Sequence, residues 1–352
     1  MAYKPKGCLL LGSVPLSDNE TVFRTCMAAM PGRLKRIPDG ETGHRRMFTM
    51  WQFAVFQSVP EMLVKFTLNG VASSRDFTKE EVDAGIAKLE QVGIETGYDK
   101  AAIESYAVFK KLQNEGVIPP QVRFQVCIPS VANVVTPFIE SAFQPGVYPL
   151  YEAALVRAIK NIQASIPHLE LSIQLDLSID NAFWDGKYMT PWFADTHDVK
   201  DFVVAYILRM IEPIAPDVEL GIHNCYGDME HKHFFEPESM QPVVERGLKL
   251  FEKSPHKIGC FHAQVPVSAM GDLEGFLEPL KELVPRMREH GTELYLGVVQ
   301  FEDEEGTKRR IEAAEKVVSR FGVATECGMG RTPVEQIEGI LKLSAEVCEP
   351  VL

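Results

Sequence analysis

The chain has 352 residues, of which 45% are hydrophobic and 24% are charged, a composition typical of globular proteins with one large domain or two ordinary ones. Its formal net charge is −13 and its basic residues are interspersed with acidic ones, which argues against nucleic-acid binding. No apolar run approaches the ~20 residues of a membrane-spanning helix, and the seven cysteines are scattered, so we expect a cytoplasmic protein that neither enters a membrane nor relies on disulfides.

Eight strand-like segments alternate with helix-like segments along the chain. The predicted strands are residues 7–15, 34–43, 123–130, 169–178, 218–227, 257–266, 293–301 and 322–330. Several are apolar at almost every position, as strands buried on both faces should be. Between them, segments such as "SMQPVVERGLKLFEK" repeat apolar residues at three- and four-residue spacing, which indicates amphipathic helices.

This alternation predicts an α/β fold of the closed (β/α)8 type, a TIM barrel. A doubly wound open sheet is the alternative, but no G-x-G-x-x-G motif follows the first strand. We interpret about residues 58–120 as extra helices inserted after the second strand region. Because no low-complexity linker divides the chain, we expect residues 1–352 to form a single domain.

Polar and reactive residues cluster at the carboxyl ends of the apolar segments, where a (β/α)8 barrel builds its active site. In chain order these residues are Gly12, Ser13, Asp39, Glu41, Asp176, Asp180, His223, Cys225, Cys260, His262, Glu326 and Cys327. Packing alone does not explain them, because apolar side chains would serve a barrel better.

His223 and Cys225 are two residues apart in a predicted strand, so their side chains point to the same face. An imidazole and a thiol side by side suit zinc, which accepts nitrogen and sulfur in a tetrahedral shell. We predict Cys327 as a third ligand and His262, or Cys260 in its place, as a fourth, unless that position stays open for substrate. The competing interpretation is a hydrogen-bonded core histidine beside a packed cysteine.

Further residues near the strand ends have candidate roles, and two of the residues already named have additional ones. Asp228 is a candidate partner for the second ring nitrogen of His223, because metal-bound imidazoles usually donate that N–H to an acceptor. Asp176, His262 and Asp228 are the candidates for acid–base work. Arg331 is a candidate contact for an anionic substrate group, or a partner of the acidic surface. His231 and His233 are interpreted as solvated loop residues, substrate contacts or additional ligands.

Five segments resemble, in the same order, motifs of the catalytic barrel of cobalamin-independent methionine synthase. They are "LLLGSVPLSDN", "PDGETG", "IQLD", "IHNCYGD" and "TECGMGR", and the resemblance spans about residues 7–345. The last two resemble the zinc-binding strands of that family. The resemblance implies a barrel of the uroporphyrinogen-decarboxylase and methionine-synthase-like superfamily with a catalytic zinc.

The resemblance also implies site residues and a reaction. It implies metal ligands at His223, Cys225 and Cys327, and substrate contacts at Gly12, Ser13, Glu41 and Asp176. The implied reaction is attack of a zinc-held thiolate on an activated methyl or alkyl group. Its partners would be a small-molecule thiol and a methyl or alkyl donor.

The sequence departs from that family at three places. "IGCFHAQVP" has Cys260 and His262 where the family has a glutamate ligand, "IQLDLSID" lacks its Glu and Pro, and "IPSVANVVTP" lacks its folate-stacking tryptophan. We therefore predict a zinc-dependent transferase that does not use a polyglutamylated folate. Two alternatives stay open: a metal-free or other-metal lyase or decarboxylase that uses histidine and carboxylate acid–base chemistry, and a small-molecule-binding barrel without turnover.

Overall fold

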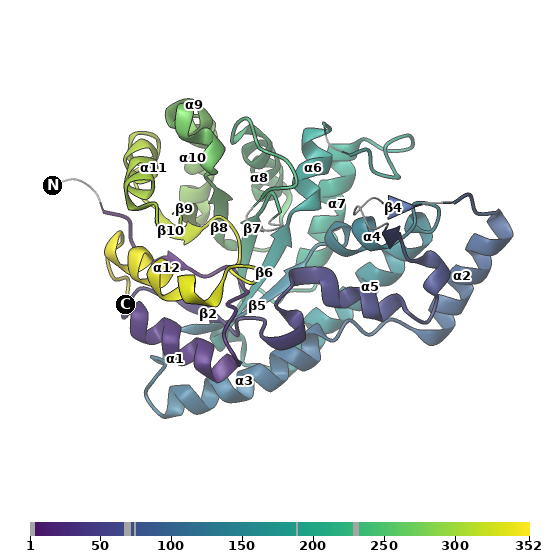
Figure 1. The fold of residues 1–352 in the computed structure, drawn as a ribbon, viewed down its shortest axis with the longest axis horizontal. Helices are drawn as coiled ribbons and strands as arrows, with labels where there is room; N and C mark the ends of the chain where they lie inside the picture. Colours follow the sequence, from purple (N-terminus) through teal and green to yellow (C-terminus); the bar gives the residue numbers. More distant parts are fainter. Residues whose placement is uncertain (1–3, 67–71, 74, 188, 228–231) are drawn as a thin grey trace.

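The structure is a computed structural model that describes residues 4–66, 72–73, 75–187, 189–227 and 232–352. Within these ranges, eight parallel strands form a nearly closed barrel surrounded by helices (Figure 1), which confirms the predicted (β/α)8 fold. The strands are β1 (Cys8–Leu9), β2 (Arg36–Pro38), β5 (Arg123–Pro129), β6 (Leu171–Leu177), β7 (Glu219–Asn224), β8 (Ile258–Gln264), β9 (Glu293–Val299) and β10 (Gly322–Thr325). Each strand lies within one predicted segment. The predicted segments are longer because their last residues belong to the loops that follow the strands.

Helices cover the outside of the barrel after each strand. The long ones are α1 (Asn19–Ala29), α3 (Tyr98–Asn114), α5 (Gln144–Ser165), α7 (Val199–Ile211), α8 (Gln241–Lys253), α10 (Leu280–His290), α11 (Glu304–Val317) and α12 (Val334–Glu346). Shorter α-helices are α4 (Ala132–Phe138), α6 (Ile179–Asp185) and α9 (Leu273–Leu277), and 3₁₀ helices are η1 (Gly43–Arg45), η2 (Phe48–Phe56), η3 (Pro60–Met62), η4 (His168–Glu170) and η5 (Val267–Gly271). Their apolar faces pack on the outer side of the sheet and make the main hydrophobic core.

The first and last strands of the sheet, β1 and β2, meet just beyond their carboxyl ends. Ser13 forms a parallel bridge with Gly40, and the Val14 N–H donates to the Gly40 carbonyl at 2.8 Å. Gly40 has a φ of +80°, a conformation that favours glycine. This closure brings the two loops that carry Ser13 and Glu41 together above the barrel.

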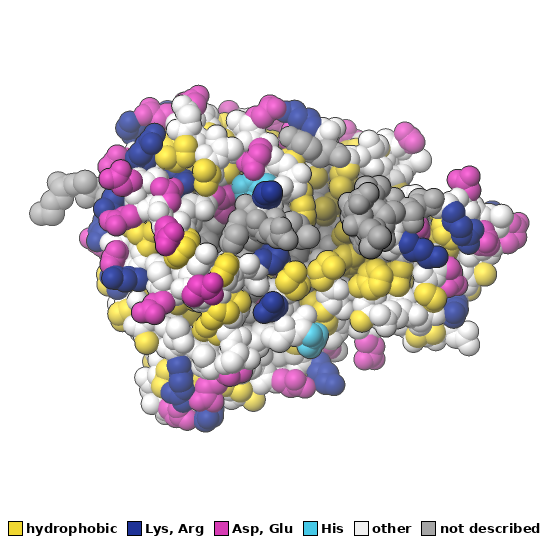
Figure 2. Space-filling model, in the orientation of Figure 1, with side chains coloured by type: hydrophobic (Ala, Val, Ile, Leu, Met, Phe, Trp, Pro, Cys, Tyr) yellow, Lys and Arg dark blue, Asp and Glu magenta, His cyan; other side chains and the backbone are white. Residues whose placement is uncertain are grey.

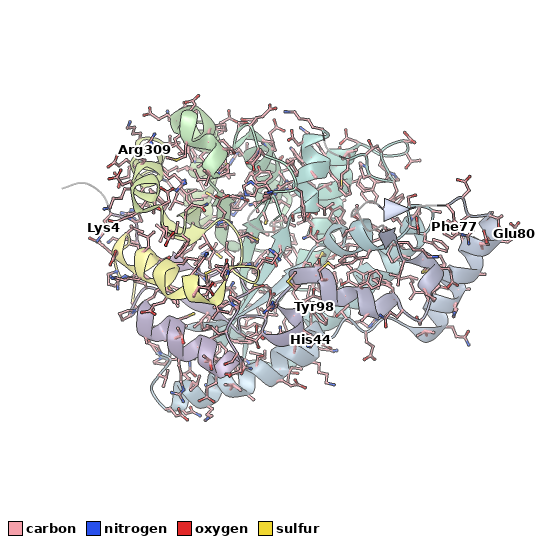
Figure 3. All side chains as sticks on the ribbon, viewed as in Figure 1. Lys4, His44, Phe77, Glu80, Tyr98 and Arg309 are labelled. Atoms are coloured by element: carbon pink, nitrogen blue, oxygen red, sulfur yellow. The ribbon has the colours of Figure 1, made fainter. Side chains whose placement is uncertain are left out.

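Residues 58–120 contain a helix that projects from the barrel and a helix that belongs to it. The projecting helix is α2 (Lys79–Val92), which begins at a capping box formed by Thr78 and Glu81. Phe77 and Glu80, labelled in Figure 3, mark the end of this projection. By contrast, α3 packs on α1, α5 and β5 as the barrel helix after β2. The same stretch includes η3 and a short antiparallel pair, β3 (Lys65–Phe66) with β4 (Ala72–Ser73). The assignment to one domain stays a prediction.

The barrel interior is polar on the side that leads to the site. On β6, Leu171, Ile173 and Leu175 belong to the outer hydrophobic core, so the alternate residues point inward. Of these, Gln174 donates to Asp176 Oδ1 at 2.7 Å and accepts from Gln125 at 3.0 Å. On β6, apolar residues that point outward therefore alternate with polar, hydrogen-bonded residues that point into the barrel.

A buried ion-pair network closes the opposite, amino-terminal end of the barrel. The Arg36 guanidinium, at the start of β2, is 2% exposed and donates to Glu219 Oε1 at 2.5 Å and to Glu293 Oε2 at 2.8 Å. Glu219 and Glu293 are the first residues of β7 and β9. The network thus joins three strands at the end remote from the predicted site.

The surface carries both signs of charge. Figure 2 shows Lys and Arg side chains interspersed with Asp and Glu on the visible face. Among the helices of the described ranges, none is long and apolar enough to span a bilayer.

Candidate metal centre and substrate pocket

The structure brings the imidazole of His223 and the thiols of Cys225 and Cys327 together at the carboxyl end of the barrel. His223 lies in β7 and Cys225 directly follows that strand, whereas Cys327 follows β10. One ligand atom from each residue lies within 4.8 Å of the others, and the two Sγ atoms are 3.2 Å apart. Both cysteines are free thiols. Two sulfurs and one imidazole nitrogen at such spacing are a donor set that fits zinc, with a fourth position left for a substrate.

His262 lies behind His223 and outside this three-residue group. Adjacent strands β7 and β8 pair His223 with His262, and their Nδ1 atoms are 2.9 Å apart. The other ring nitrogen of His262, Nε2, lies 3.1 Å from the Thr325 carbonyl oxygen. Both ring nitrogens of His262 are thus engaged, which favours the arrangement with three ligands and an open position over His262 as a fourth ligand.

These hydrogen bonds fix the tautomers of both histidines. A carbonyl oxygen only accepts, so His262 carries its proton on Nε2. Burial lowers the pKa of His262 to about 4, and His262 is therefore neutral and its Nδ1 accepts a proton from His223 Nδ1. The lone pair of His223 is consequently on Nε2, where the described residues offer it no hydrogen bond, as a metal ligand requires.

Each of the two neighbouring thiols makes ionisation of the other less favourable. The Cys327 side chain, and then burial, raise the pKa of the Cys225 thiol well above its usual range. Two adjacent thiolates, one buried and one half-buried, need a compensating cation, and a bound divalent metal would supply it. The fit to a metal therefore rests on the chemistry of the donors as well as on their spacing.

A cavity of about 250 Å³ lies against the cluster, and all three candidate ligands line it. Its polar side includes Ser13, Glu41, Asp176 and Arg331. Its apolar side includes Met47, Met50, Pro137, Phe138 and Ile179. The cavity therefore combines a polar anchor with an apolar wall, as small-molecule sites do.

Two carboxyl groups with raised pKa values face this cavity. Burial raises the pKa of Glu41 to about 7, although its hydrogen bond from the Ser13 hydroxyl favours the charged form. Burial, and then the nearby Glu41 carboxyl, raise the pKa of Asp176 well above its usual range. Such a pair is best satisfied by a cationic group between them, for example the ammonium of an amino acid.

The backbone at Glu41 is held in an uncommon conformation. Its φ is +48°, and its N–H donates to Asp39 Oδ1 at 2.9 Å. Asp39 in turn accepts hydrogen bonds from Ser105, at 2.7 Å, and from Arg45. Opposite, a Cβ on Gly12 would lie 3.2 Å from the Cys127 sulfur, and the φ of Gly12 is +113°. These constraints aim the Glu41 carboxyl into the cavity at an energetic cost, as is common at functional sites.

Of the remaining predicted site residues, Arg331 lies near the candidate ligands and Cys260 does not. Arg331 Nη2 lies 3.9 Å from Cys327 Sγ. Cys260 lies deeper in the barrel, in a small buried cluster with Leu9, Leu11, Tyr295 and Ala324, and outside the three-residue group. Asp228, the predicted partner of His223, and His231 fall outside the described residues. Met47 and Met50 were not expected at the site, because η2 and its N-cap residue Met47 form a segment without strand or helix periodicity.

The comparisons with known proteins concern the fold alone. No protein-family model matches the sequence, and no curated protein matches it. The fold is similar to a solved structure from Listeria monocytogenes described as a "Putative Vitamin-B12 Independent Methionine Synthase", with a TM-score of 0.54. The match covers 98% of this chain and 99% of that chain at 14% identity, which confirms the resemblance at the level of the fold.

Proposed function

We propose that the protein transfers a methyl or alkyl group to the sulfur of a small amino-acid thiol, with a zinc ion held by His223, Cys225 and Cys327. One observation carries the proposal: these three residues line the same cavity as Ser13, Glu41 and Asp176. When bound, zinc would supply the means to lower the pKa of a substrate thiol and keep it as a thiolate.

The chain's own residues would bind and orient the acceptor. Glu41 and Asp176 would face its ammonium group, which in turn favours their ionised forms. Arg331 would face its carboxylate, at the edge of the same cavity. Holding the acceptor at both charged groups fixes where its sulfur lies, and such positioning supplies much of the rate enhancement in two-substrate reactions.

Thiol binding to the cobalt(II)-substituted protein tests this proposal. Homocysteine and 4-mercaptobutanoic acid differ by the amino group, and the visible absorption of a cobalt–thiolate centre reports the binding of each. We expect homocysteine to bind at least about tenfold more tightly, because a buried ion pair with two carboxylates is lost in the other thiol. In Asp176→Asn the difference should shrink. Equal affinities for the two thiols in the unmodified protein would contradict the proposed amine contacts.

An acid–base lyase or decarboxylase is the second candidate, because Glu41 and Asp176 have the raised pKa values that proton-transfer catalysts need. The two candidates differ in their need for the cysteines. Turnover of a carboxylic-acid substrate that survives Cys225→Ser and Cys327→Ser would favour the lyase. Loss of thiol alkylation in both variants would favour the transferase.

A further inference from the structure

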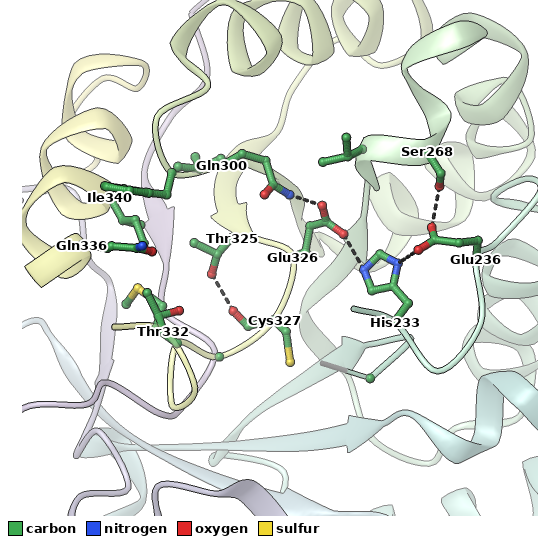
Figure 4. Close-up of a pocket in the computed structure, with 16 residues that line it drawn as sticks. His233, Glu236, Ser268, Gln300, Thr325, Glu326, Cys327, Thr332, Gln336 and Ile340 are labelled. Atoms are coloured by element: carbon green, nitrogen blue, oxygen red, sulfur yellow. Dashed lines mark hydrogen bonds and ion pairs between the residues drawn. The ribbon is translucent and has the colours of Figure 1, made fainter. Parts of the chain in front are cut away.

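A second cavity, of about 170 Å³, also has Cys327 in its lining (Figure 4). It shares Gly227, Cys327 and Gly328 with the cavity already described, so one of the three candidate ligands, Cys327, lines both cavities. A group-transfer reaction needs donor and acceptor within about 3–3.5 Å of each other at the reacting atoms. The position of the second cavity suits a second substrate.

A chain of charged side chains forms one wall of the second cavity. Figure 4 shows the His233 ring between Glu326 and Glu236. Its Nε2 lies 2.8 Å from Glu326 Oε2 and its Nδ1 lies 3.1 Å from Glu236 Oε1. Gln264 donates to Glu326 at 2.6 Å, and Gln300 also donates to it. The sequence left three interpretations of His233 open, and the structure shows it in an ion-paired network.

This wall is predominantly acidic. Burial alone would lower the pKa of His233, but the hydrogen bonds and charges of Glu326 and Glu236 outweigh it and raise that pKa to about 9. Two acidic side chains, Glu236 and Glu326, line the cavity beside one basic side chain, His233, so acidic groups outnumber basic ones there. A cation is therefore a better occupant than an anion.

Apart from the candidate ligand Cys327, the acidic protons among the described residues that line this cavity are those of His233, and neither is directed at a leaving group. Both N–H groups of His233 face carboxylates. The rest of the lining is largely apolar, with Val267, Val299, Phe301, Met329 and Ile340, and it also includes Thr332 and Gln336. Neither a hydroxyl nor an amide is a useful general acid. A donor whose leaving group needs a proton would thus be poorly served here.

We infer that the second cavity binds the methyl or alkyl donor of the proposed reaction, and that this donor is a small onium ion, either a sulfonium or a quaternary ammonium. This inference rests on the proposed transferase function. The acceptor thiolate attacks the methyl carbon and a carbon–sulfur bond forms. The bond from that carbon to the onium sulfur or nitrogen breaks, and its electron pair stays on the leaving atom. A thiolate and a cation give two neutral products, a thioether and a sulfide or tertiary amine, without a proton or another reagent.

Tetramethylammonium binding to the zinc-loaded full-length protein tests the inference. Tert-butanol and pivalate serve as neutral and anionic probes of similar shape, and ligand-observed NMR titration measures all three. We expect the cation to bind most tightly. The variant Gln336→Trp, which fills the cavity from α12, should weaken its binding about tenfold, because the added indole displaces the ligand. The matched control Glu335→Trp changes the preceding, exposed residue of the same helix and should leave binding unaltered.

Two results would overturn the inference. One is the absence of cation binding in a protein that holds zinc and binds homocysteine, which leaves the proposed function intact. The other is cation binding that Gln336→Trp does not affect but Asp176→Asn abolishes, which would place the cation in the first cavity. Absence of both zinc and thiol binding would instead refute the proposed function. With trimethylsulfonium as donor, the expected products are the S-methylated thiol and dimethyl sulfide.

Discussion

The imidazole of His262 acts on the candidate metal centre through His223. It accepts the Nδ1 proton of His223 and is itself anchored by the Thr325 carbonyl. Gly297 leaves room for this arrangement, because a Cβ there would lie 3.0 Å from His262 Nε2. Because His262 is neutral, it adds no charge to the candidate metal centre.

Replacing His262 should therefore weaken metal binding without removing a ligand. We expect His262→Phe to lower zinc affinity about 10–100-fold, the usual effect of losing a residue that orients a metal ligand. Competition with a chromogenic chelator measures it. His256→Phe is a matched control, because His256 is also buried and both of its ring nitrogens lie near carbonyl oxygens, those of Lys257 and Ala215. Unchanged zinc affinity in His262→Phe would contradict the orienting role.

Glu41 should make the stability of the metal-free protein depend on pH. Its pKa is about 7 in the folded chain and lies near 4.5 when unfolded, so the folded state binds more protons between these values. Its contribution to stability is present below pH 4.5 and is lost as pH rises to about 7. Relative to the unmodified protein, Glu41→Gln should gain roughly 1–3 kcal/mol in unfolding free energy between pH 4.5 and 8. Urea titrations with chelator present at several pH values measure this, and parallel pH profiles would contradict it.

Among the elements, the junction of β1 and β2 is the place where the fold and the pocket depend on each other. A Cβ on Gly40 would lie 2.6 Å from Val22 Cγ2, and the φ of +80° adds strain. Gly116, after α3, has a similar φ of +77° with nothing within 4 Å of an added Cβ. Comparing alanine substitutions at the two glycines therefore distinguishes the cost of backbone strain from the cost of steric overlap.

We expect Gly116→Ala to cost about 1 kcal/mol of unfolding free energy, from backbone strain alone. Gly40→Ala should cost about 1–3 kcal/mol more, because the methyl group overlaps a packed side chain. It should also weaken homocysteine binding, since Glu41 follows directly. Chemical unfolding and thiol titration measure the two effects. Equal costs for the two alanines would show that the β1–β2 junction tolerates displacement.

The strands and the three candidate ligands were predictable, but the contacts around them were not. Period-two alternation places His223 and Cys225 on one face, and strand ends of a barrel converge, so their proximity to Cys327 followed from the fold class. The role of His262 depends on a register shift between Leu220 and Gly221 that pairs it with His223. Nothing in the residue pattern reveals such a shift.

The loops were the least predictable elements, because their positions depend on contacts with distant parts of the chain. The pairing of His233 with Glu326 joins residues far apart in the chain through a segment without periodicity. The helices in residues 79–114 were indicated by their apolar spacing, whereas the role of α3 as the barrel helix depends on its packing against α1 and α5. The residue pattern of one segment predicts whether it forms a helix or a strand, but it does not predict which distant segment it contacts.

In the whole molecule, stability and chemistry are separated between the two ends of the barrel. The amino-terminal end is closed by Arg36 and its two glutamates, and the carboxyl end holds the cavities. A buried guanidinium that loses its partners, or carboxylates that lose theirs, are costly because little water can replace the lost contacts.

Arg36→Met should consequently lower the unfolding free energy by about 3–5 kcal/mol while leaving zinc affinity unchanged. The control Arg24→Met removes surface ion pairs to Glu20 and Glu115 and should cost less than about 1 kcal/mol. Urea unfolding and chelator competition on the same samples measure both quantities. A large loss of zinc affinity in folded Arg36→Met would contradict the separation of the two ends.

We propose that His223, Cys225 and Cys327 hold one metal ion, and elemental analysis of protein purified without chelator measures that metal. We predict about one zinc per chain, since a site with two thiolates and an imidazole retains zinc through purification. Cys225→Ser and Cys327→Ser should each lose the metal, whereas Cys26→Ser, at a buried cysteine of α1, should keep it. Well under one metal ion per chain in the unmodified protein, or full retention by both variants, would contradict the account.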